Sequence, residues 1–357
     1  MWPSSRFTDL VGIEYPIVQS PMIGPKPELA RHVSAAGGLG SLGCASMTPD
    51  QVRAEVAALR AFTDKPFNLN FFVHRPAPAD PARDAAWREE LKPYYAELGL
   101  NPEALIAVTN RAPFDAAMCA VVEEVRPKVV SFHFGLPAPE LMARVKAAGA
   151  VVLASATSVA EARWLEENGA DAIIAQGSEA GGHRGMFLNL DPAFQVGTFA
   201  LVPQVADAVS VPVIAAGAVA DGRGIAAAFA LGADAVQIGT AYLLTPEAGI
   251  SAVHRAALKG APDDATTLTN VFTGRPARGI LNRLMREHGP IKADAPAFPT
   301  AAPPLGPLKA AAEAKGSGDF SALWSGQAGR LAREIGAGEL TRTLAKDALE
   351  VMGRLKG

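Results

Sequence analysis

The strongest constraint on the fold of this 357-residue chain is a regular alternation of short apolar segments with helical patterns. Eight apolar segments predict strands, at 15–20, 39–43, 67–72, 129–134, 151–155, 172–176, 211–216 and 235–239. They are apolar without interruption, which is typical of parallel strands covered on both faces. The helical patterns between them include 27–37, 139–149, 158–169 and 222–232, and each ends at a glycine. We predict an α/β fold, a (β/α)8 TIM barrel, with an open doubly wound sheet as the alternative because strand counting does not show closure.

Two segments interrupt this alternation. Residues 75–112 form a polar, proline-rich insertion after the third predicted strand. Residues 244–324 contain helical patterns but no clear strand, and they predict a smaller, mostly helical subdomain inserted after the eighth strand and capping the substrate side. Residues 1–243 would then form the barrel, completed by residues 325–357.

Composition excludes several classes of function. The net charge is −3, and no basic stripe or Lys/Arg block suggests a nucleic acid or an anionic membrane as partner. The apolar runs are too short to span a bilayer, and the N-terminus lacks a signal-peptide pattern, so we expect a cytoplasmic protein. Cys44 and Cys119 are expected to be reduced thiols. Neither the cysteines nor the histidines have metal-ligand spacing, so no metal site is predicted.

One glycine motif is misleading. Residues 38–43, GLGSLG, match the G-x-G-x-x-G dinucleotide fingerprint. That motif should follow a strand and open a helix, because the pyrophosphate sits at the helix N-terminus. Here a predicted helix precedes the glycines and a predicted strand follows. The better interpretation is close packing at a helix-to-strand turn.

The last two predicted strands end in small residues, at Gly217-Ala218 and at Gly239-Thr240. In TIM barrels the loops after strands seven and eight often bind phosphate, because small residues let backbone N–H groups approach an anion. There is no Walker lysine for phosphoryl transfer. The pattern therefore predicts a tightly held phosphorylated cofactor.

Amides and glycines gather at other strand ends. Asn68 and Asn70 lie on one face of the third strand, and Gln176 ends the sixth. Amides offer both donors and acceptors to a flat heteroaromatic ring, and glycines let such a ring approach the backbone. The residues expected to contact it are Pro21, Met22, Asn70, Gln176, Gly181 and Gly182. With the phosphate site, they outline a site for FMN.

Two histidines are candidate catalytic residues. His183 follows two glycines in the loop after the sixth strand, and no apolar periodicity explains it. His133 ends the fourth strand, where a structural and an active-site role are equally compatible with the pattern. His74 is left open in the same way. The remaining three, His32, His254 and His288, lie in helical patterns and are expected to be surface or structural residues.

Six segments together resemble the nitronate monooxygenase family, formerly called 2-nitropropane dioxygenases. They are PIVQSPMIG (16–24), AAGGLGSLG (35–43), NLNFFVH (68–74), QGSEAGGHRG (176–185), VIAAGAVADGRGIAAAFALGADAVQIGT (213–240) and WSGQAGRLAR (324–333). The resemblance spans nearly the whole chain. It implies an FMN-dependent detoxifying enzyme that converts alkyl nitronates, such as propionate 3-nitronate, with O2 to a carbonyl compound and nitrite through a flavin semiquinone, usually without NAD(P)H.

The resemblance also implies roles for individual residues. His183 matches the catalytic histidine, and Gln327 matches a flavin contact near the C-terminus. The matches to phosphate contacts are Gly217, Ala218, Gly239 and Thr240. One departure concerns Ala216-Gly217-Ala218, where the family form is Ala-Gly-Gly; the methyl group leaves the N–H donor intact, so we expect the phosphate site to survive.

Several alternatives remain open from the sequence. An NAD(P)H-dependent quinone or enoyl-thioester reductase could use the same FMN barrel. A flavin-free aldolase or isomerase would need a Lys or carboxylate at a strand end, and Glu179 is the nearest candidate. His183 could act as a charge or as a base. The oligomeric state is undetermined, with a homodimer as one arrangement.

Overall fold

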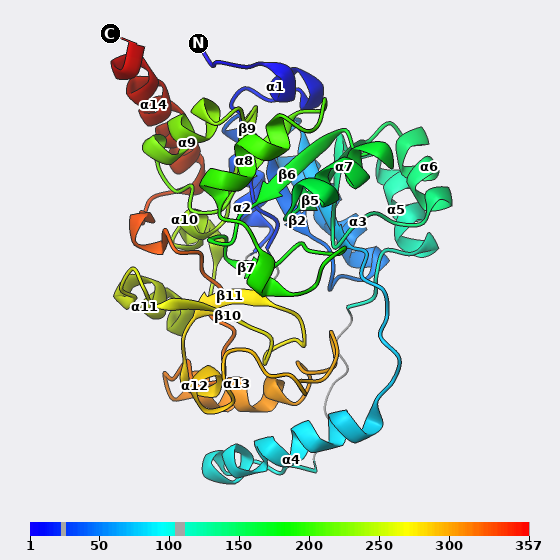
Figure 1. Cartoon of the computed structure of the whole chain (residues 1–357), viewed down its shortest axis with the longest axis vertical. Helices are drawn as coiled ribbons and strands as arrows, with labels where there is room; N and C mark the ends of the chain where they lie inside the picture. The colour runs from blue at the N-terminus through cyan, green and yellow to red at the C-terminus, as the bar shows by residue number, and fades with distance from the viewer. Residues whose placement is uncertain (23–25, 104–110, 357) are drawn as a thin grey trace.

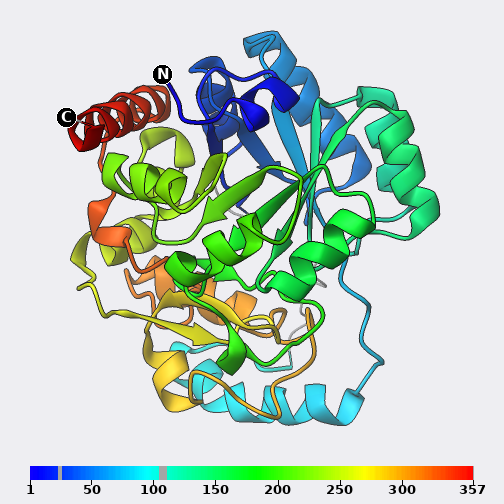
Figure 2. The ribbon, with the colours of Figure 1, turned by 45° about the horizontal axis from the view of Figure 1, so that its top comes forward.

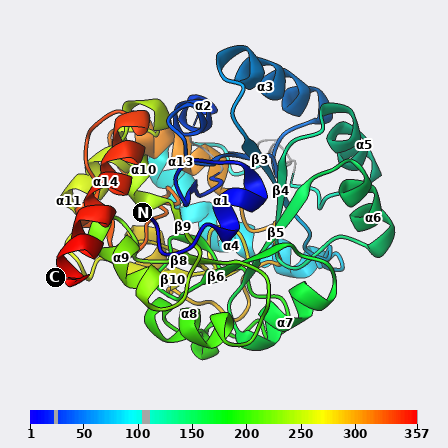
Figure 3. The ribbon, with the colours of Figure 1, turned by 90° about the horizontal axis from the view of Figure 1, so that it is seen from above.

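The parallel strands of the computed structural model form a closed barrel (Figures 1 and 3). The structure describes residues 1–22, 26–103 and 111–356. Within them the barrel strands are β1 (Ile17–Gln19), β2 (Gly40–Gly43), β3 (Phe67–Phe72), β4 (Val129–His133), β5 (Val151–Ala156), β6 (Ala172–Gln176), β8 (Val213–Ala216) and β9 (Ala235–Ile238). Each pairs with its neighbour, and β1 pairs with β9. A parallel bridge between Val18 and Leu39 closes the ring beside β2. The predicted TIM barrel is confirmed, and the open-sheet alternative is wrong.

Helices surround the barrel as the alternating pattern predicted (Figure 3). They are α2 (Glu28–Ala35), α3 (Pro49–Phe62), α5 (Ala116–Val125), α6 (Pro139–Ala147), α7 (Val159–Glu167), α8 (Thr198–Ala206), α9 (Gly222–Ala230), α10 (Thr240–Leu243) and α14 (Ala337–Lys356). The first helix, α1 (Arg6–Val11), instead covers the end of the barrel, where its Phe7 and Val11 pack against the barrel interior. Several of these helices start at a residue whose side chain caps the first turn. Thr48, for example, forms a capping box with Gln51 at the start of α3. The last helix, α14, packs against α9 and α2, so the C-terminal segment returns to the barrel.

A smaller unit lies on one side of the barrel (Figures 1 and 2). It contains α11 (Ala252–Gly260), α12 (Arg283–Glu287) and α13 (Leu305–Ala314), together with β10 (Thr266–Thr269) and β11 (Ala277–Ile280). The expectation that 244–324 holds no strand was wrong, because β10 and β11 pair as an antiparallel hairpin. Both strands have four residues, and their sequences, TTLT and ARGI, lack the long apolar run that identified the barrel strands.

The insertion after β3 joins this smaller unit. Its helix α4 (Pro81–Leu98) packs against α13, with Trp87 and Leu91 buried beside Leu284 and Leu308. The apolar face of α4 therefore covers the subdomain rather than the barrel. The expectation that 244–324 alone forms the subdomain left this helix out. Residues 104–110 of the predicted insertion lie outside the described residues.

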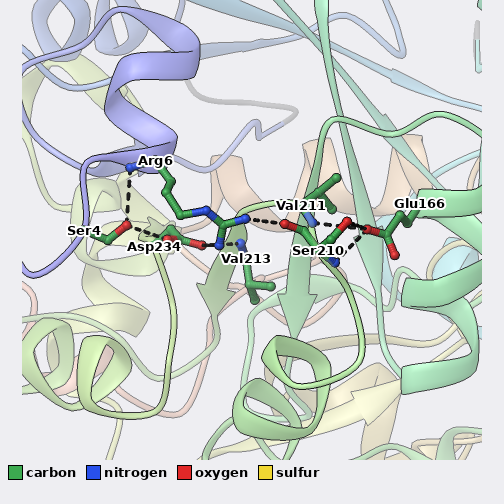
Figure 4. Close-up of polar contacts among 7 residues, drawn as sticks. All are labelled: Ser4, Arg6, Glu166, Ser210, Val211, Val213 and Asp234. Atoms are coloured by element: carbon green, nitrogen blue, oxygen red, sulfur yellow. Dashed lines mark hydrogen bonds and ion pairs between the residues drawn. The ribbon is translucent and has the colours of Figure 1, made fainter.

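A polar network ties the N-terminus to the end of the barrel at which the strands begin (Figure 4). Asp234 accepts hydrogen bonds from Ser4 Oγ at 2.6 Å and from Val213 N at 3.0 Å, and Arg6 pairs with it at 3.2 Å. Glu166 accepts from Ser210 N at 2.7 Å. Polar groups at this end of a TIM barrel serve stability, whereas the opposite end carries the chemistry.

No helix in the described part of the chain is long and apolar enough to cross a membrane.

The GLGSLG segment serves packing, as interpreted from its context. A Cβ atom on Gly40 would lie 2.0 Å from the carbonyl oxygen of Ala30 in α2, so only glycine lets the strand pass this close to the helix. The clash would be with backbone atoms of Ala30, so no change of side-chain rotamer could relieve it. The segment therefore positions α2 against β2.

We expect Gly40→Ala to lower the free energy of unfolding by about 2–3 kcal/mol, because α2 must move to admit the methyl group. The matched control is Gly353→Ala in α14, where a Cβ would meet nothing within 4 Å. That change should raise the stability by about 0.5–1 kcal/mol, through helix propensity alone. Urea unfolding monitored by circular dichroism measures both, and equal effects would contradict the packing role.

Candidate active site

A cavity of about 330 Å³ opens at the end of the barrel where the parallel strands terminate. The predicted site residues that line it are Pro21, Met22, Asn70, His133, Gln176, Gly181, Gly182, His183, Gly217, Ala218, Gly239 and Thr240. The structure thus brings together twelve residues from separate strand ends. Gln327 is the exception: its side chain is exposed, and its neighbours Gly326 and Ala328 line the cavity instead.

Several cavity residues were missed by sequence reasoning. Gln237 in β9 could have been noticed, because it is a polar residue within an apolar strand. His254 was expected at the surface or in a structural role, but it lines the cavity, with Nε2 3.0 Å from the carbonyl oxygen of Trp324. Arg111 comes from a segment with no periodic pattern, so nothing in the sequence marked it; Trp324 opens the WSGQAGRLAR motif, but sequence reasoning assigned it no role. His74, left open from the sequence, is buried but is not among the lining residues.

The loop that carries His183 is shaped by Arg184. This arginine is fully buried, and its guanidinium donates to the carbonyl oxygens of Gly177 at 3.0 Å, Gly181 at 3.3 Å and Gly182 at 2.9 Å, and also to that of Ala180. Buried carbonyl groups need donors, and a guanidinium offers five N–H groups in a fixed plane. One side chain therefore determines the path of the whole loop.

Gly181 and Gly182, which precede His183, are needed for different structural reasons. A Cβ on Gly181 would lie 2.5 Å from the amide nitrogen of Gly326, so this glycine admits the C-terminal segment. Gly182 has a φ of +73°, in the left-handed region, and a Cβ there would meet nothing within 4 Å. Gly182 and His183 form the two-residue strand β7, which pairs with β11 of the subdomain hairpin.

His183 is held by both its backbone and its ring. Its carbonyl oxygen accepts from Gln176 Nε2 at 3.0 Å and from His133 Nε2 at 3.2 Å. Its ring Nε2 lies 3.0 Å from the hydroxyl of Thr273, which donates its single proton to the carbonyl oxygen of Arg275 at 3.3 Å. The arrangement that satisfies both bonds puts the imidazole proton on Nε2. Nδ1 then remains as a lone-pair acceptor with no partner among the described residues.

His133 is a positioning residue for His183. Because a carbonyl oxygen only accepts, Nε2 of His133 must carry the proton that bonds to the His183 backbone. Its Nδ1 accepts from Ser155 Oγ at 3.0 Å. Burial, with Arg275 nearby, lowers the pKa of His133 to about 3. The ring is therefore neutral at physiological pH.

The environment also keeps His183 neutral. Burial, followed by the charge of Arg111, lowers the pKa of His183 well below its usual value. Aromatic rings enclose the imidazole, with the ring centroids of Phe298 and Trp324 both at 5.6 Å. A positive imidazolium is disfavoured in such a place, because it would lose its hydration and face other cations.

Two acceptor oxygens at the cavity lack protein donors. Asn70 uses its Nδ2 group on Ser131 Oγ at 2.9 Å and on the Ser131 carbonyl oxygen at 3.2 Å, which leaves its Oδ1 free among the described residues. Gln237 Oε1 is buried without a partner in the same part of the chain. Gln176 differs from expectation, because its amide is already bonded to the backbone of His183 and Gly185. Acceptor oxygens at a cavity that have no protein donor indicate a ligand with N–H groups.

The end of the cavity near β8 fits an anion. Gly217 and Ala218 have φ values of +124° and +55°. Their backbone N–H groups find no acceptor among the described residues. Consecutive free amides in such a turn form a concave site for negative charge. The left-handed conformation of Ala218 costs about 1–2 kcal/mol relative to a glycine there, so the family departure at this position keeps the same backbone shape.

Within the described residues, no group of three or more His, Cys, Asp and Glu side chains is arranged to hold a metal ion.

Comparison with known proteins places this site in a family. A sequence model described as nitronate monooxygenase matches residues 4–347. A nitronate monooxygenase from Pseudomonas aeruginosa is 45% identical, covering 96% of this chain and 99% of that protein. One from Paraburkholderia phytofirmans is also 45% identical, covering 97% and 96%.

Solved structures agree with this placement. A nitroalkane oxidase from Streptomyces ansochromogenes has a TM-score of 0.90 and 41% identity, covering 98% of this chain and all of that one. FabK from Thermotoga maritima has a TM-score of 0.74 and 30% identity, covering 100% and 99%. Fold and site together define an oxidoreductase built on a TIM barrel. The chain belongs to the nitronate monooxygenase family.

The neutral state of His133 predicts a dependence of stability on pH. An unfolded histidine takes up a proton near pH 6.5, whereas folded His133 does so only near pH 3. The neutral state of His133 therefore makes its full contribution to the free energy of unfolding above pH 6.5, and this contribution is lost as the pH falls toward 3. The slope in this window is about 1.4 kcal/mol per pH unit for one histidine. Denaturant unfolding of His133→Gln between pH 6 and 4 should show a slope reduced by about that amount; an unchanged slope would exclude a neutral buried His133.

Proposed function

We propose that this protein is an FMN-dependent enzyme that oxidises alkyl nitronates, propionate 3-nitronate among them, with O2 to a carbonyl compound and nitrite. The observation that carries the proposal is the cavity at the strand ends, which brings backbone amides of Gly217 and Ala218 that have no acceptor among the described residues into one site with His183. The similarity to the nitronate monooxygenases and to nitroalkane oxidase supports the same activity.

The residues present fit FMN. The free amides of Gly217 and Ala218 would hold the phosphate, with Gly239 and Thr240 beside them. The unpartnered acceptors Asn70 Oδ1 and Gln237 Oε1 would receive N–H groups of a heteroaromatic ring. When bound, FMN would supply the electron acceptor for the nitronate and the group that O2 reoxidises.

His183 would act as a base rather than as a positive charge. Its protonated form is disfavoured by burial and by nearby cations, and Thr273 holds the proton on the opposite ring nitrogen. Nδ1 is therefore available to take the α-proton of a neutral nitroalkane. The aromatic walls contributed by Phe72 and Trp324 exclude water from the place where that transfer occurs. A nitronate, which has already lost this proton, does not need the base.

The test of this role is His183→Asn, assayed by O2 uptake. Oxidation of a neutral nitroalkane should fall about 10²–10⁴-fold, the usual worth of a positioned base. Oxidation of the matching nitronate should fall much less, and the yellow cofactor should remain bound. Equal losses on both substrates would assign His183 an electrostatic role, and full activity on both would remove it from the mechanism.

A second candidate function is reduction of a quinone or enoyl thioester with NAD(P)H. The observation that favours it is the similarity to FabK over the full chain. Anaerobic mixing with NADH or NADPH distinguishes the two functions. Rapid bleaching of the flavin would support the reductase, whereas an inert flavin together with O2 uptake on adding a nitronate would support the oxygenase.

A further inference from the structure

Arg111 is a cation at the cavity whose Nη1 atom has no partner among the described residues. This atom is buried, and the side chain lines the cavity. No carboxylate of the described chain forms an ion pair with it. Because a guanidinium carries five donors and stays charged in proteins, a buried one without a partner is costly. The arrangement therefore calls for an acceptor that the described residues do not supply.

The other cations near His183 differ in that their guanidinium groups donate to backbone carbonyl groups, although the Nε atoms of Arg184 and Arg275 are also buried without a partner among the described residues. Arg184 donates to the loop carbonyl groups. Arg275 donates to the carbonyl oxygen of Met186 and lies 3.8 Å from the ring centroid of Phe134. Arg278 donates to the carbonyl oxygen of Ser178 at 2.8 Å. These three side chains are not among the residues that line the cavity, whereas Arg111 is.

The carboxylates around the cavity are also accounted for. Glu179 accepts from the backbone and hydroxyl of Thr198, and Glu313, at the α13 side, accepts from Ser321 Oγ at 2.7 Å. Lys309, the other cavity-lining cation, is exposed and lies beside Glu313 and His254. The charge of Arg111, by contrast, acts directly on His183.

We propose that Arg111 forms an oxyanion subsite beside His183, which binds a planar two-oxygen anion of the substrate. Nitronate and carboxylate groups share this shape, and a guanidinium matches it with two parallel N–H donors. In this arrangement Arg111 would bind the negatively charged group of the substrate. His183 would remain neutral and act as the base. This inference rests on the proposed function for the identity of the substrate, but the binding site itself does not.

The test compares Arg111→Met with wild type on three substrates of equal carbon number: propionate 3-nitronate, propyl-1-nitronate and neutral 1-nitropropane. We expect kcat/KM for propionate 3-nitronate to fall about 10- to 100-fold, the range for a lost hydrogen bond to a charged group. The value for 1-nitropropane should follow that for propyl-1-nitronate, because removal of its α-proton creates the same anion; it should fall if the subsite holds the nitronate group and stay unchanged if the subsite holds the carboxylate. An equal loss on both nitronates places the subsite at the nitronate group, and a loss confined to propionate 3-nitronate places it at the carboxylate. Arg111→Lys should lose less kcat/KM for propionate 3-nitronate than Arg111→Met, because lysine keeps the positive charge but lacks the planar set of N–H donors.

A binding measurement separates this inference from the proposed function. Inorganic nitrate is a planar oxyanion that the enzyme cannot oxidise as a nitronate. Calorimetric titration of the holoenzyme at constant ionic strength should show nitrate binding that weakens at least about tenfold in Arg111→Met. If nitrate binding depends on Arg111 while no nitronate is oxidised, the subsite stands and the proposed function fails.

The matched control is Arg75→Met, an exposed arginine in the same insertion and outside the cavity, which should leave every value unchanged. Thermal unfolding of each variant checks that the fold is intact. The inference is overturned if Arg111→Met alters neither nitronate turnover nor nitrate binding, if it lowers 1-nitropropane oxidation while both nitronates are unaffected, or if Lys309→Met alone causes these losses.

Discussion

The site depends above all on the buried guanidinium of Arg184. Its donors satisfy four carbonyl groups of the loop between β6 and β7, and those bonds determine how the loop turns. The loop then delivers Gly182 and His183 to β11, where they pair as a short strand. The barrel and the subdomain are thereby joined through His183, the residue proposed as the base. A lysine could not replace this arginine, because a single ammonium lacks the planar set of donors.

Electrostatics assign different tasks to the side chains of the cavity. The arginines around His183 keep its ring uncharged, and Thr273 and His133 hold its ring and backbone in one orientation. Burial strengthens every such interaction, because water no longer screens it. A neutral base and a separate cation can then coexist in one pocket. The same cations would favour a substrate that enters with a negative charge.

The sequence predicted much of this arrangement, and the misses have identifiable causes. Strand ends could be located because apolar runs stop at polar residues such as His133 and Gln176. The task of Gln176 could not be predicted, because its amide bonds to backbone groups whose positions depend on the folded loop. Gln327 was assigned by resemblance to a motif, and only its neighbours reach the cavity. Motif matching locates a segment, whereas side-chain direction depends on the backbone around it.

The sequence by itself determined the barrel, the end at which the site lies and the histidine at its centre. It did so because apolar periodicity and strand order reflect local forces along the chain. Tertiary structure alone decided what the histidine does. Its protonation depends on burial and on Arg111, which lies 72 positions away (183 minus 111) in a segment without any pattern. Its placement depends on β11, which is 94 positions away (277 minus 183) at the paired residue Ala277. Such distant contacts exist only after folding, so no local pattern of residues encodes them.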